Sequence, residues 1–423
     1  MRRVLTAFAM VLAAAFPQAA AAQSRECSIA EQSLFVRDVM SEIYLWYQQI
    51  PALDPTTFPS PADYLEAIRY RPIDRTFSYI TSRAANDALF SSSQYVGFGL
   101  STTLEGDRFR VTQVFPGGAA AEAGLERGDS FVMINGRLVS DLLSTGEIGN
   151  AFGPAEAGVT ADIVFQRGEA TLRGRMIKRE VVIPTVSHTQ VINLGGRRVG
   201  YIFFRNFVEP SIAALDEAFA HLQREHVTEL VLDLRYNGGG LVNVAQHLGG
   251  LIGGTLTNGQ VFAEYAHNDR NTFRNRTLRF AATEQSLTLN RVFAITTQAS
   301  ASASELVINA LKPFLPVVVV GERTYGKPVG QYAINFCDKV LAPVSFALRN
   351  ANGEGDFFGG LPPDCAAADD LDHQIGNPAE ASLREAMVFM ETGSCSPARF
   401  PRLGRSTGGP PRRQGWSTLV GAD

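Results

Sequence analysis

Residues 229–240 read ELVLDLRYNGGG, and residues 241–252 continue as LVNVAQHLGGLI. The apolar run of the first segment predicts a buried strand, and the second segment predicts a helix. The three glycines between them suit a tight turn, and they let a ligand approach backbone N–H groups closely. In α/β folds, ligand sites lie where strands end in this way. A merely flexible strand–helix connection would have the same pattern.

Strands and helices continue to alternate on both sides of this segment. We expect strands over residues 198–204, 292–297 and 317–320, and helices over residues 212–225 and 303–311. Strands that alternate with helices are typical of an α/β domain with a mostly parallel sheet. The sequence therefore predicts such a domain over residues 181–395.

Residues 94–180 have a different pattern. Glycine-containing turns separate short β-like runs, which lie at residues 109–114, 130–134 and 160–165. This spacing predicts a small β-rich domain, with one short helix over residues 119–125.

The segment before residue 94 is expected to be mainly helical. Apolar residues recur at helical spacing over residues 28–75, so we predict an N-terminal helical region over residues 23–93. Residues 76–93 have a mixed composition with a polar end, which favours a linker.

Both ends of the chain have an unusual composition. Residues 1–22 start with Arg2 and Arg3, continue as a short apolar stretch and end in three alanines. This arrangement predicts a signal peptide, because the alanines form the small-residue pattern that a signal peptidase accepts. The apolar stretch is too short to cross a bilayer. No later segment is long and apolar enough to do so, and we expect an exported protein, periplasmic or secreted. Residues 396–423 are rich in Gly, Pro and Arg and predict a disordered tail.

The overall composition limits the classes of partner. Of the 423 residues, 45% are hydrophobic, which is enough for a large buried core. The formal charge is −4 and no long basic run precedes the tail, so a nucleic-acid partner is not expected. The four cysteines lack the spacing of a zinc site, and no HExxH motif is present. In an oxidising compartment they favour disulfides. Of the three possible pairings we predict Cys337–Cys365 with Cys27–Cys395.

Residues 297–305 read TQASASASE and follow the strand at 292–297. A serine at the start of a helix can direct its hydroxyl into a cleft, where the helix N-terminus favours negative charge. The spacing of Ser302 and Glu305 also fits a helix-capping box without any catalytic role. Ser300 or Ser304 can serve as the cap and Ser302 as a nucleophile, and the spacing alone leaves this choice open.

Residues 321–328 read GERTYGKP and follow the valine-rich strand at 317–320. The glycines and Lys327 come near the pattern of a phosphate-binding loop. Pro328, however, replaces the Ser or Thr that would hold Mg²⁺, and it lacks a backbone N–H. A second interpretation makes Lys327 a general base, whose pKa an apolar wall would lower. A surface lysine on a glycine turn fits this segment as well.

Taken together, these three segments resemble the carboxy-terminal processing peptidases, also called tail-specific proteases. That family has an Asp-Leu-Arg-x-Asn-x-Gly-Gly segment, a Ser-Ala-Ser-Glu segment and a Gly-Lys lysine, in this order. The resemblance assigns the nucleophile to Ser302 and the general base to Lys327, which follows 25 residues later as in the family. It also implies that Gln331 orients the lysine.

The same resemblance implies which groups stabilise an oxyanion. The donors would be the backbone amides of Ala303 and of Gly238 or Gly239. This chain departs from the family in having Pro328 where many members have glycine after the lysine. The fold implied is an α/β protease core of the ClpP/crotonase-like type, with an inserted β-rich domain and an N-terminal helical segment.

Residues 94–180 resemble a PDZ domain. The run PGGAAAEAGL at 116–125 carries most of the likeness, and the four residues Gly97, Phe98, Gly99 and Leu100 take the place of the carboxylate-binding loop. In PDZ domains such a loop captures a peptide C-terminus while the peptide adds a strand to a sheet edge.

The resemblance therefore implies a serine endopeptidase that acts on polypeptides, recognised through their C-termini, without a metal or organic cofactor. The alternative is a non-enzymatic peptide-binding protein of the PDZ type on a protease-like fold.

Overall fold

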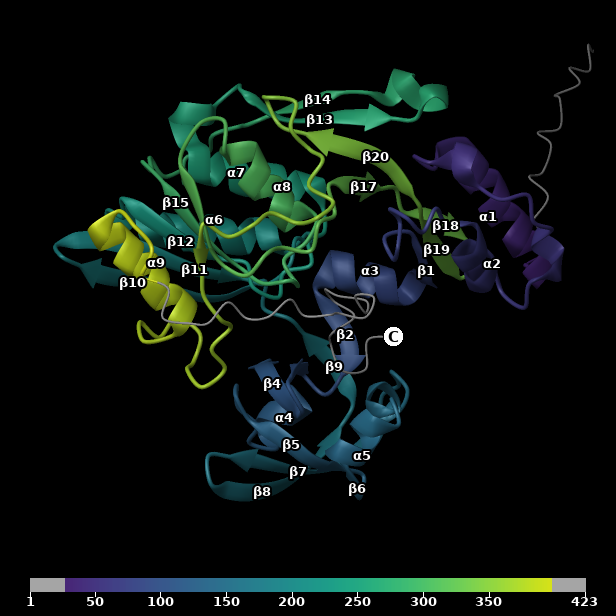
Figure 1. The fold of residues 1–423 in the computed structure, drawn as a ribbon, viewed down its shortest axis with the longest axis horizontal. Helices are drawn as coiled ribbons and strands as arrows, with labels where there is room; N and C mark the ends of the chain where they lie inside the picture. Colours follow the sequence, from purple (N-terminus) through teal and green to yellow (C-terminus); the bar gives the residue numbers. More distant parts are fainter. Residues whose placement is uncertain (1–26, 398–423) are drawn as a thin grey trace, which may run out of the picture.

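The computed structural model describes residues 27–397, and its centre is a six-stranded sheet (Figure 1). The strand order is β10-β11-β12-β15-β16-β21. Only β10 runs antiparallel to its neighbour, and every other pair in this sheet is parallel. The bounds are β10 Val186–Leu194, β11 Arg197–Phe204, β12 Glu229–Asp233, β15 Val292–Thr296, β16 Val317–Gly321 and β21 Cys365–Ala366. The predicted strands of the core lie within one or two residues of these bounds.

Helices cover both faces of this sheet. Ile202, Leu230 and Ala294 point to one face, where they pack against helices α6 (Ser211–Arg224), α7 (Val242–Thr257) and α8 (Ala303–Leu311). The neighbouring strand residues, among them Val231 and Ile295, point to the opposite face and pack against α9 (Ala381–Thr392). Because both faces are buried, the strands are apolar throughout rather than alternating, as expected of parallel sheets.

A second sheet lies beside the core and contains the strand that directly follows the lysine segment. Its order is β14 (Thr277–Arg279), β13 (Val261–His267), β20 (Val344–Arg349) and β17 (Val329–Gln331). The short helix η4 (Asp269–Arg274) lies in the connection between β13 and β14.

The N-terminal region packs against this second sheet (Figure 1). It contains the helices α1 (Ile29–Ile43) and α2 (Pro61–Ile68) and the single turns η1 (Tyr47–Gln49) and η2 (Pro55–Thr57). A three-stranded sheet, in the order β1 (Tyr79–Ser82), β19 (Lys339–Ala342), β18 (Ile334–Phe336), joins the region to the core. The predicted linker at 76–93 is wrong, because these residues form β1 and the helix α3 (Arg83–Ser92). The β1 strand pairs with β19, more than 250 residues away, and no local pattern reveals such a partner.

The β-rich module lies below the core in Figure 1. Strands β2 (Gln94–Gly97) and β9 (Arg179–Val182) pair with each other where the chain enters and leaves it. Between them lie β3 (Leu100–Glu105), β4 (Arg108–Val114), β5 (Ser130–Ile134), β6 (Arg137–Leu138), β7 (Thr160–Arg167) and β8 (Ala170–Ile177), with α4 (Ala119–Glu122), α5 (Val139–Ser144) and η3 (Ile148–Asn150). The order β3-β4-β5-β7-β8 makes β3 an edge strand that can accept a further strand.

Two disulfides join Cys27 to Cys337 and Cys365 to Cys395. The predicted pairing is therefore wrong. Cys337 lies in the turn between β18 and β19, next to Phe336, whose ring stacks on Phe35 of α1 with centroids 5.0 Å apart. Cys365 lies in β21, at the edge of the central sheet. The two cysteines are close in sequence but belong to different sheets, so each bonds to the segment that packs beside its own sheet, near one limit of the described residues.

The predicted signal peptide and nearly all of the predicted disordered tail lie outside the described residues. Between residues 27 and 397, none of the helices combines the length and apolar character needed to cross a bilayer.

Candidate active site

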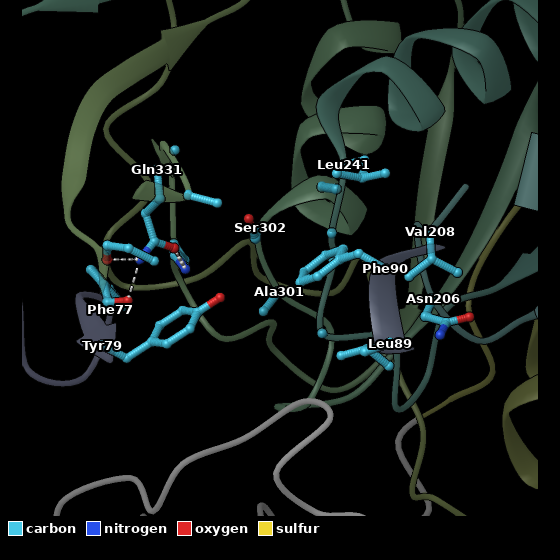
Figure 2. Close-up of a pocket in the computed structure, with 18 of the residues that line it drawn as sticks. Phe77, Tyr79, Leu89, Phe90, Asn206, Val208, Leu241, Ala301, Ser302 and Gln331 are labelled. Atoms are coloured by element: carbon cyan, nitrogen blue, oxygen red, sulfur yellow. Dashed lines mark hydrogen bonds between the residues drawn. The ribbon is translucent and has the colours of Figure 1, made fainter. Parts of the chain in front are cut away.

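One cavity of about 500 Å³ brings the predicted catalytic segments together. Its lining includes residues from the glycine turn, from the serine segment and from the lysine segment, namely Gly238, Gly239, Ser302, Ala303, Lys327 and Gln331. Figure 2 shows Ser302 between Gln331 on one side and Phe90, Asn206 and Val208 on the other. The core residues singled out by the sequence therefore share one site.

Ser302 immediately precedes helix α8 and has an unusual backbone conformation. Its φ is 54° and its ψ is −112°, a region that residues other than glycine rarely adopt. Such strain persists only where surrounding contacts fix it, and it is frequent at functional sites. Here the Ser302 amide donates a hydrogen bond to Glu305 Oε2 at 2.8 Å.

The two neighbouring serines are buried and already hydrogen-bonded. Ser300 Oγ donates to the Leu234 carbonyl at 2.8 Å, and Ser304 Oγ donates to the Asn237 carbonyl at 2.9 Å. Both hydroxyls therefore fasten the serine segment to the turn that follows the strand β12. Of the three serines, only Ser302 lines the cavity.

Glu305 connects the serine segment to the lysine segment. Besides the Ser302 amide, its carboxylate accepts hydrogen bonds from Thr324 Oγ1 at 2.5 Å, the Gly326 amide at 2.7 Å and the Lys327 amide at 2.9 Å. The side chain is fully buried, and burial raises its pKa while these donors oppose the rise. Sequence reasoning found Glu305 only as a capping residue, because the spacing from Ser302 does not reveal partners on a distant loop.

Lys327 lies in an environment that weakens its positive charge. Burial lowers the pKa of its amine to about 8, against the opposing charges of Asp74 and Glu305. Its Nζ lies 5.7 Å from the centroid of the Phe77 ring. Within residues 27–397, Nζ donates one hydrogen bond, to Gln331 Oε1 at 2.5 Å, and none to Ser302. An amine with such a pKa is partly neutral near neutral pH and can then accept a proton.

Gln331 is oriented by two backbone carbonyls. Its Nε2 donates to the Phe77 carbonyl and to the Ala342 carbonyl, each at 2.6 Å (Figure 2 draws this group). Since the amide nitrogen is occupied, the amide oxygen faces Lys327. Phe77 belongs to the N-terminal region, which therefore helps to build the lysine pocket rather than only covering it.

The glycine turn lies against the serine segment. A Cβ added to Gly239 would lie 2.8 Å from the Ser302 Cβ and 2.8 Å from the Ala303 nitrogen, and φ is 97° there, so only glycine fits. The Gly239 amide donates to Asn237 Oδ1 at 3.0 Å, whereas the Gly238 amide has no partner among the described residues. Ala303 begins α8, so its N–H points out of the helix end. Gly238 and Ala303 are thus the better candidates for oxyanion donors.

An arginine of the β-rich module reaches the glycine turn. Arg127 donates to Tyr236 Oη at 2.7 Å and to Asp369 Oδ1 at 2.9 Å. Tyr236 itself donates to Asp369, and Arg235 pairs with Asp369 at 3.1 Å. This buried network links the module to the two residues that precede Asn237. The sequence offered no signal for Arg127.

A second arginine of the module, Arg167, pairs with Glu126 and Asp129 inside the module itself.

The predicted carboxylate-binding loop lies outside the lining of the cavity. Phe98 and Leu100 are buried in the core of the module, and the carbonyls of Phe98 and Gly99 accept hydrogen bonds from Ala120 and Phe115. Gly99 has a φ of 82° and approaches Gly118 so closely that a Cβ would lie 2.6 Å from its Cα. The loop therefore ends at the open edge strand β3, where a peptide can add.

Comparison with protein families identifies the chain. A model of Peptidase family S41 matches residues 198–367, and a model of the Peptidase S41 N-terminal domain matches residues 31–79. The chain belongs to peptidase family S41. A PDZ domain model matches residues 110–160 of the S41 chain, within the β-rich module.

Two relatives of this S41 family member carry names of one kind. It is 29% identical over 270 residues to the chloroplastic C-terminal processing peptidase of Tetradesmus obliquus, and the matched segment covers 59% of this chain and 54% of the relative. It is 26% identical over 258 residues to the carboxy-terminal processing protease CtpB of Bacillus subtilis, which covers 61% of this chain and 52% of the relative. The chain thus spans about half the length of the curated relatives it matches.

A solved S41 protease from Bacteroides fragilis has the same fold, with a TM-score of 0.71 and 26% sequence identity. The match covers 84% of this chain and 97% of the other. The predicted fold class, an α/β protease core with a PDZ domain and an N-terminal helical segment, is confirmed.

Proposed function

We propose that this S41 peptidase is an exported serine endopeptidase in which Ser302 is the nucleophile and Lys327 the general base. The observation that carries the proposal is the state of the lysine. A buried amine with a pKa lowered to about 8, held by Gln331, lines the same cavity as Ser302. Serine attacks a peptide carbonyl only when a neighbouring group takes its proton, and a partly neutral lysine can do so.

The reaction would be an acyl transfer in two halves. Ser302 Oγ forms a bond to the carbonyl carbon as its proton passes to the neutral amine of Lys327. The oxyanion accepts hydrogen bonds from the amides of Gly238 and Ala303. The C–N bond then breaks, and Lys327 gives the proton to the leaving amine. Water repeats the attack on the ester, with its proton passing through Lys327 back to Ser302 Oγ.

The lysine must approach Ser302 for this chemistry, since its hydrogen bond now goes to Gln331. Catalytic hydrogen bonds often tighten only when substrate fills a site. The role of Gln331 is then to position Lys327, and the role of Glu305 is to hold both catalytic segments in register through its four hydrogen bonds.

The nucleotide-binding alternative conflicts with the backbone of the lysine segment. A phosphate loop needs free backbone N–H groups to cradle the phosphates. Here the amides of Gly326 and Lys327 both donate to Glu305, and Pro328 has none to offer. A buried carboxylate in the place of a phosphate also repels anions.

The PDZ module and the disulfides extend the proposal to substrates and location. The open edge of β3 and the loop at residues 97–100 suit capture of polypeptide C-termini. The two disulfides favour an oxidising compartment outside the cytoplasm. Substrates would therefore be envelope or secreted proteins.

Digestion of an unfolded protein tests the function. The chain from residue 23 onward should cleave it, whereas Ser302→Ala and Lys327→Met should not, and Ser300→Ala should retain cleavage if it folds. A non-enzymatic binding protein would leave the substrate intact in every lane. Cleavage by Ser302→Ala equal to that by the parent would refute the assignment.

A further inference from the structure

Arg205 is a buried cation at the cavity. It follows strand β11, and its backbone amide donates to the Thr185 carbonyl at 2.7 Å. The residue is 3% exposed and lines the cavity beside Asn206 and Val208, which Figure 2 places opposite Gln331.

No carboxylate pairs with this guanidinium among the described residues. Its Nη1 donates to the Tyr236 carbonyl, while Nε and Nη2 make no hydrogen bond. Burial lowers the pKa of Arg205 to about 10, and only the Tyr95 and Tyr236 phenols oppose this shift, through the negative charge they carry when ionised at high pH. An unpaired buried charge is costly, and a native protein that keeps one usually has a use for it.

A second donor without a partner lies next to Arg205. Tyr95 Oη is buried, and its O–H has no acceptor among the described residues. Burial raises the pKa of this phenol, whereas three nearby groups lower it: the charge of Arg205 and the amides of Gly99 and Leu100. These groups therefore lie close to the hydroxyl. The unpaired groups of Arg205 and Tyr95 therefore gather where the catalytic core meets the loop at residues 97–100.

We propose that Arg205 binds a carboxylate of the polypeptide substrate, with the Tyr95 hydroxyl as a second donor. The proposal rests on the proposed peptidase function and names a feature of its substrates. A guanidinium offers two parallel N–H groups that match a carboxylate, and Nε with Nη2 forms such a pair. Both atoms are covered by protein in this structure, so the side chain must turn toward the cavity that Arg205 lines to present them. The carboxylate would come either from the C-terminus of the chain or from an Asp or Glu side chain.

The position of Arg205 gives this contact a consequence for catalysis. The segment from Arg205 to Phe207 runs along the glycine turn, since the Phe207 amide donates to the Gly239 carbonyl at 3.0 Å. Arg205 itself holds the carbonyl of Tyr236, two residues before Gly238. A carboxylate on Arg205 would therefore anchor the substrate across the glycine turn from Ser302. Arg205 would then help to select which peptide bond lies over the nucleophile.

Peptide binding to the Ser302→Ala protein tests the proposal without turnover. Three fluorescent peptides of one apolar sequence serve as probes. The first ends in a free carboxylate, the second in an amide, and the third in an amidated glutamate. Affinities are measured by fluorescence anisotropy for Ser302→Ala alone and with Arg205→Met, Tyr95→Phe or Arg173→Met added. Arg173 is an exposed arginine on β8 and serves as the matched control.

We expect the parent to bind at least one carboxylate-bearing peptide about tenfold or more tightly than the plain amide. Arg205→Met should abolish this difference, Tyr95→Phe should reduce it, and Arg173→Met should leave it intact. A preference for the free acid identifies the terminal carboxylate as the source, and a preference for the amidated glutamate identifies a side chain. Equal affinity for all three peptides in the parent, or an unchanged preference in Arg205→Met, would overturn the proposal.

Folding does not confound this test. Arg205→Met removes an unpaired buried charge at similar volume but also the hydrogen bond to the Tyr236 carbonyl, so these effects offset and the unfolding temperature should change little. Tyr95→Phe deletes one hydroxyl whose O–H has no acceptor among the described residues. Cleavage of protein by Ser302→Ala would refute the peptidase mechanism. It would leave open the preference for carboxylate-bearing peptides, which the binding measurements decide on their own.

Discussion

Raising the pH from 7 to 9 should increase kcat/KM about tenfold, because the proposed base works only as a neutral amine. The pKa of Lys327 is lowered to about 8. At that value roughly a tenth of the amine is neutral at pH 7 and roughly nine tenths at pH 9. Peptide cleavage measured across this range should therefore rise along a single titration with its midpoint near pH 8.

The lowered pKa of Lys327 also predicts how the free energy of unfolding changes with pH. Its folded pKa of about 8 lies below the ordinary 10.5, so the unfolded chain binds more protons between these values. Burying the charged amine costs the folded state up to ~3 kcal/mol below pH 8, and the cost disappears as the pH rises toward 10.5. Lys327→Met should thus be more stable than the parent at pH 7, by at most that amount, and the advantage should shrink toward pH 10.

Denaturant unfolding at pH 7 and pH 10 measures this difference, with Lys312→Met as a control on a lysine at the end of α8. The control should show no change of its effect with pH. A kcat/KM that is flat from pH 7 to 9, or a Lys327→Met advantage that grows with pH, would refute the account of a buried, weakly basic lysine.

Three further predictions concern residues around the proposed catalytic pair. Glu305→Gln keeps the shape but exchanges one acceptor oxygen for an NH₂ group, which faces two of the four donors; each unmatched donor costs about 1–3 kcal/mol. Protein digestion should fall by at least an order of magnitude, while a drop below twofold would show that the four hydrogen bonds are dispensable. Gly239→Ala places a Cβ 2.8 Å from the Ser302 Cβ and should reduce kcat far more than peptide affinity in the inactive background. Arg127→Met breaks the contact with Tyr236 and Asp369 and should change the activity of the full chain without lowering peptide binding to the PDZ module; unchanged activity would mean that this contact does not transmit to the site.

The core of the fold follows from local sequence because its strands are buried on both faces. The run VFAIT at 292–296 and the run VVVV at 317–320 are apolar without interruption, and few structures other than a central parallel strand use such a segment. The turns after these strands then place Ser302 and Lys327 at one edge of the sheet. Local pattern and topology agree here, so the sequence was sufficient.

Local pattern fails where a distant partner decides the structure. Residues 79–82 form a strand only because β19 pairs with them, and Cys337 bonds to Cys27 because α1 packs against β18. Glu305 looks like an ordinary capping residue until the lysine loop folds onto it. In each case the deciding contact joins segments that are far apart in the chain, and their order along the sequence does not encode their distance in space.

The choice among the three serines shows what the sequence can decide and what it cannot. Spacing alone allowed Ser300, Ser302 or Ser304, and the family resemblance selected Ser302. The structure adds a physical distinction, because the hydroxyls of Ser300 and Ser304 already donate hydrogen bonds to the carbonyls of Leu234 and Asn237. Sequence cannot supply that distinction, because it depends on which hydroxyls meet the neighbouring strand.

The most direct test of the central claim is to trap the acyl-enzyme. The protein is mixed with an activated peptide thioester, stopped with acid and digested for mass spectrometry. A mass increase equal to the acyl group on the fragment that contains Ser302, absent in Ser302→Ala and strongly reduced in Lys327→Met, is the predicted result. Continued turnover with no acyl group on Ser302, or with the acyl group on another residue, would contradict the account.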